Sequence, residues 1–484
     1  MRTLTTEVAV IGAGTAGLAA YRAAVAAGAR ALIVEGGPYG TTCARVGCMP
    51  SKLMIAAADA AHVTARWPDF GLRLKGSLEI DGRAVMARIH RERDHFVGFV
   101  LDAVESIPAG DRVRGAARFV DERTLHVDEH TTIAFERAVI ATGSSPHVPP
   151  SWQHLGKRLI INDDIFSWED LPRSVAVFGP GIVGLELGQA LHRLGVAVTM
   201  YGRSDHVGPF TDPELYAYAA HTFQAEFPLF LDAQIVSMEL VDSVDSGVAI
   251  RRVTATGSEQ TIMVDYAIAA VGRTPNVRGL SLSSTGVPLD QQGVPRFDRS
   301  TMQVGSSNIF IAGDVGDDAP LLHEAADEGR LAGDNAARYP QVRAGTRRAP
   351  LAIVFSDPQL TIVGSRFADL QTGTFVVGKA SFENQGRSRI ILRNRGLLHL
   401  YADKNTGRFL GAEMIGPDAE HIGHLMAWAL QMKLTIAQML EMPFYHPVIE
   451  EGLRTGLRDA VSKLASAPAS VRPNAMQETQ FAME

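Results

Sequence analysis

Two cysteines, Cys43 and Cys48, are the residues of this sequence that most directly suggest chemistry. Four residues separate them, Gly47 eases a turn between them, and Lys52 follows in a helix-favouring run. A helix N-terminus and a lysine ammonium both stabilise a thiolate, so the segment predicts a redox-active disulfide. Buried core thiols or half of a metal site are the alternatives. We expect no metal, because the chain has no further cysteine and no histidine nearby at zinc-finger spacing.

A histidine followed by two acids near the other end of the chain is the second candidate. Pro447 predicts the first residue of a helix, with His446 at its mouth and Glu450 and Glu451 in its first turn. The alternative is a helix start whose acids only complement the helix dipole. Beside a disulfide, an imidazole can take a thiol proton and return it while a carboxylate holds its tautomer. We therefore predict His446 as a base and Glu451 as its orienting partner.

The N-terminal segment has the pattern of a dinucleotide-binding βαβ unit. A β-branched run ends at glycines, an Ala-rich stretch favours a helix, and residues 31–35 indicate a second buried strand. The glycines have the spacing that allows a tight turn, backbone approach to a pyrophosphate and close helix packing, in the order Gly12, Gly14 and Gly17. Glu35, 21 residues after Gly14, stands where a carboxylate would bind ribose hydroxyls. A turn that binds nothing is the alternative.

The same pattern returns in residues 174–201, and its glycines repeat the spacing of the first unit: Gly179, Gly181 and Gly184. The position equivalent to Glu35 is Gly202, so the acid is missing, and Arg203 lies beside the vacant position. A ribose 2′-phosphate would meet no carboxylate there and would gain a cation, which favours NADP(H) over NAD(H). The alternative is that Arg203 is a solvated surface charge next to Asp205.

Composition excludes several other classes of protein. Apolar residues make up 46% and charged residues 20% of the 484, a globular balance. The 46 Lys and Arg against 53 Asp and Glu give a net charge of −7, which disfavours nucleic-acid binding. No apolar run is long enough to span a bilayer and the first residues lack a secretory signal, so we expect no membrane association and a cytoplasmic protein. Two cysteines are too few for a secreted disulfide framework.

Taken together, these motifs resemble the flavoprotein disulfide reductases, the family that includes dihydrolipoamide dehydrogenase, glutathione reductase and mercuric reductase. The resemblance covers about residues 5–465. It implies an α/β fold with two Rossmann-like domains and a C-terminal α+β domain that forms a homodimer. The implied ranges are 1–150 and 276–345 for the FAD-binding domain, 151–275 for the NAD(P)-binding domain, 346–465 for the interface domain and 466–484 for a flexible tail.

The resemblance also assigns roles to residues. Cys43 would be the thiol that faces the substrate and Cys48 the thiolate that touches the flavin. His446 and Glu451 match a pair that relatives donate from the partner subunit. The implied cofactor contacts, beyond the glycines above and Glu35, are Thr42, Ala141, Thr142, Gly143, Gly313, Asp314 on the ribityl chain, His323 near the pyrimidine edge, Gly272, Arg273, and an ion pair of Lys52 with Glu186 beside the flavin ring.

Within the family, Cys-Met-Pro-Ser-Lys is more similar to dihydrolipoamide dehydrogenase and mercuric reductase than to glutathione reductase, which tends to have Lys at the position of Ser51. Mercuric reductases carry extra C-terminal cysteines and lack the His446 motif, so dihydrolipoamide dehydrogenase is the nearest sibling. Two departures stand out. Gly202 replaces the acid that holds NAD ribose, and Arg45 replaces the usual Asn between the cysteines, which suggests a different substrate contact.

The expected activity is therefore transfer of two electrons between a dithiol substrate, small or carried on a lipoyl domain, and NAD(P) through FAD and the disulfide. A reductase of a low-molecular-weight disulfide is one alternative. A flavin diaphorase or transhydrogenase with bystander cysteines is another. A redox sensor without turnover is disfavoured, because a sensor has no need of the proton relay at His446.

Overall fold

The computed structural model describes residues 2–241 and 247–465, so the predicted tail at 466–484 lies outside the described residues. The chain forms two compact units. Unit 1 contains residues up to 57 together with 80–171 and 268–347, and unit 2 contains residues 58–79, 172–267 and those from 348 onward. Each unit is described by itself.

Unit 1 is built on a seven-stranded sheet with the order β3-β2-β1-β6-β5-β4, in which β17 also pairs with β6. The pairs β1–β2, β1–β6, β2–β3 and β6–β17 are parallel. Alternate residues of β1 enter two different cores, Val8 and Val10 on one face and Ala9 and Ile11 on the other. A parallel sheet covered on both faces explains why the end of this strand, residues 8–11, is apolar at every position. The strands are β1 (Arg2–Ile11), β2 (Ala31–Glu35), β3 (Arg112–Arg114), β4 (Ala117–Asp121), β5 (Thr124–Val127), β6 (Thr131–Ile140) and β17 (Ile309–Ile311).

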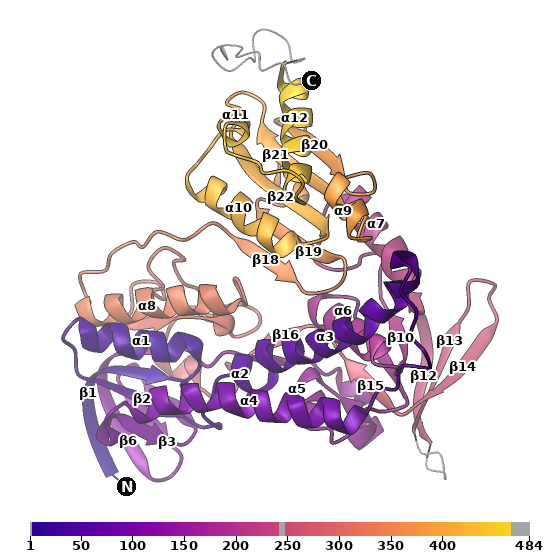
Figure 1. The fold of residues 1–484 in the computed structure, drawn as a ribbon. Coiled ribbons are helices and arrows are strands. Elements are labelled where there is room, and N and C mark those ends of the chain that lie inside the picture. The colour runs from indigo at the N-terminus through magenta and orange to yellow at the C-terminus, as the bar shows by residue number, and fades with distance from the viewer. Residues whose placement is uncertain (1, 242–246, 466–484) are drawn as a thin grey trace. The chain divides into compact units, whose positions relative to one another are not determined.

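Helices α1 (Thr15–Ala26) and α8 (Leu322–Arg338) lie side by side against this sheet (Figure 1). Their backbones touch, because a Cβ atom added to Gly329 would lie 2.1 Å from the carbonyl oxygen of Ala16, and one added to Gly333 would lie 2.1 Å from that of Ala20. The other helices and short strands of the segments that make up unit 1 are α2 (Thr42–Val46), the first part of α3 (Cys48–His62), α4 (Gly82–Glu105), α5 (Asn162–Ile165), β7 (Ser144–Pro146), β8 (Leu159–Ile160) and β16 (Arg273–Pro275).

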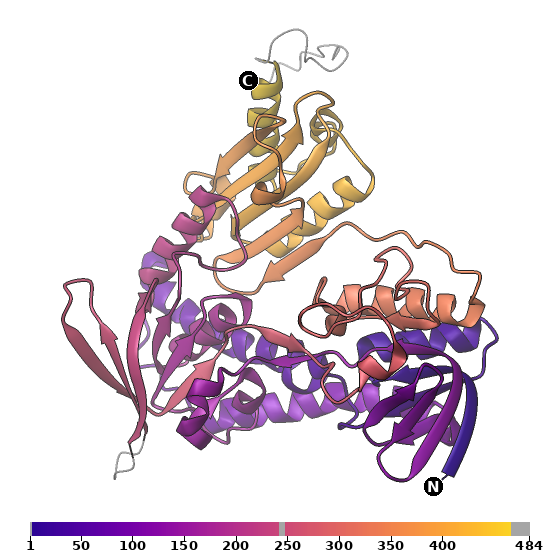
Figure 2. The ribbon, with the colours of Figure 1, turned by 180° about the vertical axis from the view of Figure 1, so that it is seen from behind.

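Unit 2 contains the second βαβ pattern. Strand β9 (Ser174–Phe178) leads into α6 (Ile182–Arg193) and then into β10 (Ala197–Tyr201), which pairs with β9 in parallel. The sheet order runs β11-β10-β9-β15, with α7 (Pro213–Gln224) preceding β11 (Leu229–Phe230) and with β15 at Tyr266–Ala269. A separate antiparallel sheet follows (Figure 2), made of β12 (Gln234–Val241), β13 (Gly247–Val253) and β14 (Glu259–Val264).

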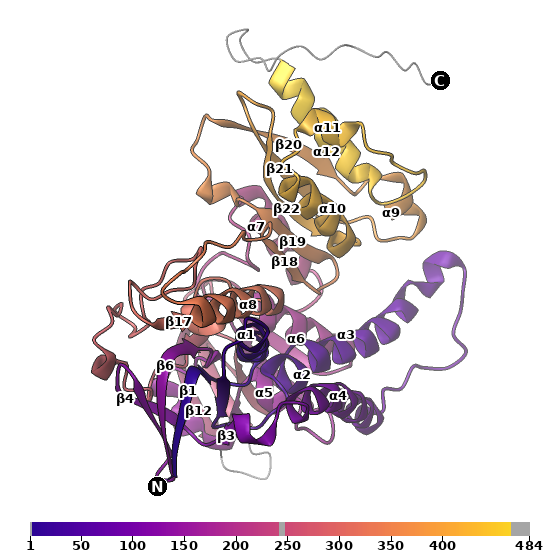
Figure 3. The same ribbon diagram turned by 90° about the vertical axis from the view of Figure 1, so that its left-hand side faces the viewer.

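The C-terminal part of unit 2 is a five-stranded antiparallel sheet with the order β18-β19-β22-β21-β20. Helices α10 (Ala419–Gln431) and α12 (Glu451–Ala465) share one buried core with it and pack on it (Figure 3). The remaining elements are β18 (Leu351–Val354), β19 (Gln359–Gly364), β20 (Phe375–Ser381), α9 (Gly386–Ile390), β21 (Leu397–Asp403), β22 (Phe409–Gly416) and α11 (Ile436–Leu440). The predicted fold class, two Rossmann-like units plus an α+β part, is confirmed.

The predicted helix start at Pro447 is wrong, because α12 begins at Glu451. Val448 is held outside the helix at both of its backbone groups. Its N–H donates to the Glu451 carboxylate at 3.3 Å, and its carbonyl accepts from Gln385 Nε2 at 2.7 Å. The Glu451 carboxylate therefore fixes the backbone that leads into the helix, a role that the Pro447 signal does not reveal.

Across residues 2–241 and 247–465, no helix combines the length and the apolar character that crossing a lipid bilayer requires.

The contact between α1 and α8 gives a first prediction. Gly329→Ala places a methyl group against the backbone of Ala16, so the helices must separate, and we expect a loss of about 1–3 kcal/mol of stability. Gly98→Ala is the matched control, because Gly98 lies inside α4 with open space at its Cβ position, and removing a helical glycine there should stabilise by about 0.5–1 kcal/mol. Thermal and urea unfolding midpoints measure both. Equal midpoints for the two variants would contradict the close contact.

Candidate active site

A cavity of about 390 Å³ opens at the carboxyl ends of β1 and β2 in unit 1. This is the edge of a parallel sheet where ligands of α/β proteins bind. Most of the first group of predicted cofactor residues line it together. They are Gly12, Gly14, Glu35, Thr42, Ala141, Thr142 and Gly143.

The three glycines of the first unit differ in what surrounds them. Gly12 has a φ of +104°, and a Cβ atom there would lie 2.3 Å from the carbonyl oxygen of Ala141. A Cβ atom on Gly17 would lie 1.8 Å from the carbonyl oxygen of Gly12, so Gly17 sits against the turn rather than in the cavity wall. Gly14, by contrast, has nothing within 4 Å of its Cβ position. It leaves open space at the N-terminus of α1, where backbone N–H groups favour an anion.

Glu35 stands at the end of β2, as predicted from the spacing. Its carboxylate accepts the N–H of Ala13 at 2.7 Å and the N–H of Gly37 at 2.6 Å. These contacts hold the carboxylate in the cavity wall and join the glycine turn to the end of the second strand.

A hydrogen-bonded chain connects several more predicted residues in unit 1. The Arg273 Nε–H donates to Ser144 Oγ at 2.7 Å, and the Ser144 hydroxyl donates to the Asp314 carboxylate at 3.1 Å. Asn276 also holds the cavity wall, because its side-chain amide donates to the carbonyl of Thr142 at 3.0 Å and its own carbonyl accepts from the Thr142 hydroxyl at 2.8 Å. Gly272 precedes Arg273 with a φ of +110°.

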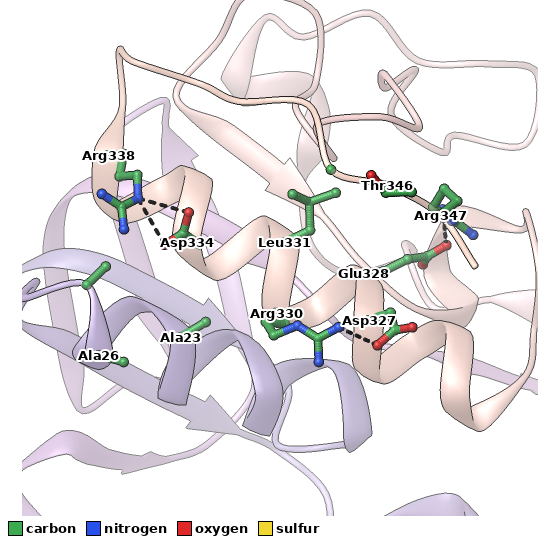
Figure 4. Close-up of a pocket in the computed structure, with 12 residues that line it drawn as sticks. Ala23, Ala26, Asp327, Glu328, Arg330, Leu331, Asp334, Arg338, Thr346 and Arg347 are labelled. Carbon is green, nitrogen blue, oxygen red and sulfur yellow. Dashed lines mark hydrogen bonds and ion pairs between the residues drawn. The ribbon is translucent and has the colours of Figure 1, made fainter. Parts of the chain in front are cut away.

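The Gly313–Asp314 turn is fixed from the side of α8. The Gly313 N–H donates to the Glu328 carboxylate at 2.8 Å, and Arg347 forms an ion pair with Glu328 at 2.8 Å (Figure 4). These two side chains line a second cavity of about 560 Å³ beside α8. Figure 4 shows its other charges paired among themselves, Asp327 with Arg330 and Asp334 with Arg338. His323 is exposed in the first turn of α8.

The two cysteines are adjacent thiols in this structure. Cys43 lies in α2, Cys48 is the first residue of α3, and their side chains are hydrogen-bonded. The hydrogen bond with Cys48 and burial raise the pKa of the Cys43 thiol, although Lys52 acts in the opposite direction. The proton therefore stays on Cys43. Cys48, at the N-terminus of a 15-residue helix, is the sulfur that the helix dipole favours as a thiolate.

His446 and Glu451 are brought together in unit 2. Nδ1 of His446 lies 3.1 Å from the Glu451 carboxylate, which also accepts from the Arg454 guanidinium at 2.8 Å. Burial acts to raise the pKa of Glu451, but hydrogen bonds from His446 and from the N–H of Val448 hold that pKa below its ordinary value. An ionised carboxylate only accepts, so Nδ1 carries the proton and Nε2 keeps its lone pair. The His446 side chain is 79% exposed, so Nε2 can meet a substrate or another chain.

The second nucleotide unit repeats the backbone of the first. Gly181 caps α6 with φ and ψ of −83° and −168°, against −79° and −170° for Gly14 before α1. Gly179 has a φ of +107°, and Gly184 is buried in α6. A Cβ atom on Gly202 would lie 3.1 Å from side chains of Leu231 and Pro180, so a side chain there would be closely packed. Arg203 is exposed.

Lys52 and Glu186 belong to different units, and their predicted pairing stays a prediction. Within unit 2, Glu186 is 6% exposed and accepts the N–H of Phe355 at 2.9 Å.

Sequence reasoning missed several residues in and around the first cavity. Asn276 lines the cavity just after β16, and Ser144 begins β7 and holds Asp314. Neither carries a motif of its own, although Asn276 lies in the noted Arg-Thr-Pro-Asn run. Arg45 lines the cavity as well, whereas the sequence suggested a substrate contact for it. Glu328 and Arg347 support Gly313 from residues that are distant in the sequence, so only the fold reveals them.

Comparison with known proteins agrees with this architecture. Residues 6–329 match the family model described as pyridine nucleotide-disulphide oxidoreductase, and residues 351–456 match the dimerisation domain of the same family. Mercuric reductase from Shigella flexneri is 31% identical over 456 residues, covering 93% of this chain and 79% of that protein. Dihydrolipoyl dehydrogenase from Geobacillus stearothermophilus is 28% identical over 457 residues, covering 92% of this chain and 94% of that protein.

Among solved structures, LpdA from Mycobacterium tuberculosis superposes with a TM-score of 0.80 at 23% identity, covering 94% of this chain and 99% of that one. The copper(II) complex of the HOCl-induced flavoprotein disulfide reductase RclA from Escherichia coli gives 0.79 at 21% identity, covering 95% and 99%. These two similarities support the fold. Since the first family model spans more than half of the sequence, the chain belongs to the pyridine nucleotide-disulphide oxidoreductase family.

Proposed function

We propose that this chain is a FAD-dependent dithiol/disulfide oxidoreductase that moves two electrons between a dithiol of the dihydrolipoamide type and NAD(P). The observation that supports this proposal most directly is the hydrogen-bonded pair of Cys43 and Cys48. Thr41 and Thr42 of the same segment line the first dinucleotide cavity. Sulfur that can be oxidised and reduced therefore sits next to the cavity of a dinucleotide cofactor.

The residues of that cavity fit FAD. Gly14 leaves open space at the N-terminus of α1, as a pyrophosphate requires, and Glu35 stands at the end of β2 where ribose hydroxyls bind. Asp314, held by Ser144, would bind the ribityl chain. When bound, FAD supplies the two-electron transfer between the cysteine pair and the pyridine nucleotide.

In the oxidative direction, Nε2 of His446 takes a proton from one substrate thiol. The resulting thiolate attacks the Cys43 sulfur of the Cys43–Cys48 disulfide, which forms a mixed disulfide and releases Cys48 as a thiolate. The second substrate sulfur then attacks the first one in the mixed disulfide, which releases the oxidised substrate and breaks the bond to Cys43. Cys43 leaves with the proton that the His446 imidazolium returns, and the imidazole takes the proton of the second substrate thiol. Glu451 stabilises the imidazolium that exists between these steps.

The dimerisation-domain match indicates homodimers in this family. We propose that the partner subunit's His446 serves Cys43, so that the site needs two chains. The His446–Glu451 relay also favours a dithiol as substrate over a metal ion, because a dithiol delivers protons that must be removed. Reduction of mercuric ion is the second candidate function, suggested by the 31% identity to a mercuric reductase. The assays below compare it directly with dihydrolipoamide turnover.

The sulfur chemistry is tested by Cys48→Ser. The variant cannot form the disulfide, so we expect dihydrolipoamide turnover to fall by at least about a thousandfold. Bound flavin and flavin-mediated reduction of ferricyanide by NADPH should survive, because Cys48 is not part of the cavity wall. Steady-state rates of the wild-type enzyme with dihydrolipoamide, glutathione disulfide and mercuric ion identify the substrate. An undiminished dihydrolipoamide rate would show that the cysteines take no part in turnover. It would contradict the proposed function and support the alternative of a flavin diaphorase with bystander cysteines.

The proton relay is tested by His446→Gln and Glu451→Gln. We expect kcat with dihydrolipoamide to fall by about a hundredfold to ten-thousandfold in the first and by about tenfold to a hundredfold in the second. His130→Gln is the matched control, since His130 also lies near a carboxylate, Asp128 at 3.7 Å, but belongs to a surface turn of unit 1. Steady-state kinetics over pH 5 to 9 measure all three. A His446 variant with the wild-type pH profile would rule out the relay.

Nucleotide preference is tested by Arg203→Ala. If Arg203 pairs with a 2′-phosphate, the KM for NADPH should rise about tenfold or more while the KM for NADH stays constant. Arg408→Ala removes another exposed arginine of unit 2, just before β22, and should change neither value. Equal shifts for both nucleotides in the Arg203 variant would reject the preference for NADP(H).

A further inference from the structure

Arg45 lies in the wall of the dinucleotide cavity, together with Thr42 and the glycine turn. Arg45 follows Thr42 by three positions in α2, so the two side chains share one face of that helical turn. Cys43 is two positions away and points to a different side. The fold therefore aims Arg45 at the dinucleotide cavity and not at the sulfur pair.

Gly40 makes this placement possible. It has a φ of +118°, and a Cβ atom there would lie 2.9 Å from Cδ and 3.0 Å from Cγ of Arg45. The aliphatic stem of Arg45 thus lies on the bare backbone of Gly40. A side chain at position 40 would push the Arg45 stem away from this place in the cavity wall.

The charge of Arg45 is not compensated inside the described part of the chain. Within residues 2–241 and 247–465 its guanidinium has no hydrogen bond and no ion pair, although the side chain is partly buried. The cavity carboxylate, Glu35, is engaged by the N–H groups of Ala13 and Gly37. Asp163 is the carboxylate whose pKa responds to Arg45, but burial raises that pKa, and Arg273 opposes the rise more strongly than Arg45 does.

A partly buried guanidinium that shares a cavity with the N-terminus of α1 is suited to a phosphate, which accepts two parallel hydrogen bonds from it. We propose that Arg45 binds the pyrophosphate of FAD and adds a charged contact to those of the α1 backbone. This inference rests on the FAD site proposed above. According to this inference, Arg45 helps to retain FAD and does not contact the substrate.

The experiment uses full-length apoprotein from which FAD has been removed. Rebinding of FAD is followed by flavin fluorescence, and ADP and adenosine are titrated as competitors of that rebinding. For Arg45→Gln we expect FAD and ADP to bind about tenfold to a hundredfold more weakly, since each has a pyrophosphate, while adenosine competes as it does in the wild type. Arg22→Gln is the matched control, because Arg22 is exposed on α1 outside the cavity, and it should bind all three ligands normally.

Wild-type affinity for FAD and ADP in Arg45→Gln overturns the inference, and so does an equal loss for adenosine. A changed KM for the dithiol with unchanged FAD binding would show that Arg45 contacts the substrate, and this result also overturns the inference. Failure of the wild-type apoprotein to bind FAD would instead contradict the proposed FAD site, on which this inference rests. If Arg45→Gln does not fold, Arg45→Lys carries the test, because an ammonium keeps the charge but not the paired hydrogen bonds and should weaken ADP by a smaller factor.

Discussion

The close backbone contact among Gly12, Gly17 and Ala141 is the constraint on which the first half of the molecule depends. Cβ atoms at the two glycines would come within 2.3 and 1.8 Å of carbonyl oxygens, so no other residue can stand at either position without moving β1, α1 or β6 apart. Because these three elements meet so closely, the α1 N-terminus opens directly over the ends of the strands. The same closeness recurs on the other side of α1, where Gly329 and Gly333 touch its backbone. The close approach of backbone thus sets the position of the cavity, and side chains such as those of Glu35 and Asn276 complete its wall.

The reactive groups depend on a different principle, the placement of single protons. Cys43 keeps its proton because of the hydrogen bond with Cys48, while Cys48 begins a helix whose dipole favours negative charge. At the other end of the chain, Glu451 stays ionised and so holds the proton of His446 on Nδ1. In the histidine pair, the carboxylate is free of a proton and the imidazole holds one on Nδ1. That asymmetry is what thiol–disulfide exchange with a general base requires.

The sequence was most informative where backbone geometry restricts residue type. The two βαβ units and the place of Gly12 follow from the glycine pattern, because its backbone turn and its close contact with Ala141 exclude a side chain. The place of Glu35 follows from its spacing after the glycines, and the short separation of Cys43 and Cys48 keeps their sulfurs within reach of each other. The start of α12 was predicted incorrectly because Val448 is held by Gln385, which is distant in the sequence. For the same reason the support of Gly313 by Glu328 and Arg347 could not be predicted. Local patterns do not encode such tertiary partners.

The two nucleotide units show where specificity can reside when geometry is shared. Gly14 and Gly181 have nearly the same backbone angles, so the helix N-termini present equivalent N–H groups to a pyrophosphate. The units differ in the residue at the end of the second strand, Glu35 in one and Gly202 in the other. Crowding by Leu231 and Pro180 leaves little room for a side chain at Gly202. A residue that projects from outside the strand end is therefore a candidate for the nucleotide preference proposed above. Arg203, adjacent and exposed, has the position and the charge for that role.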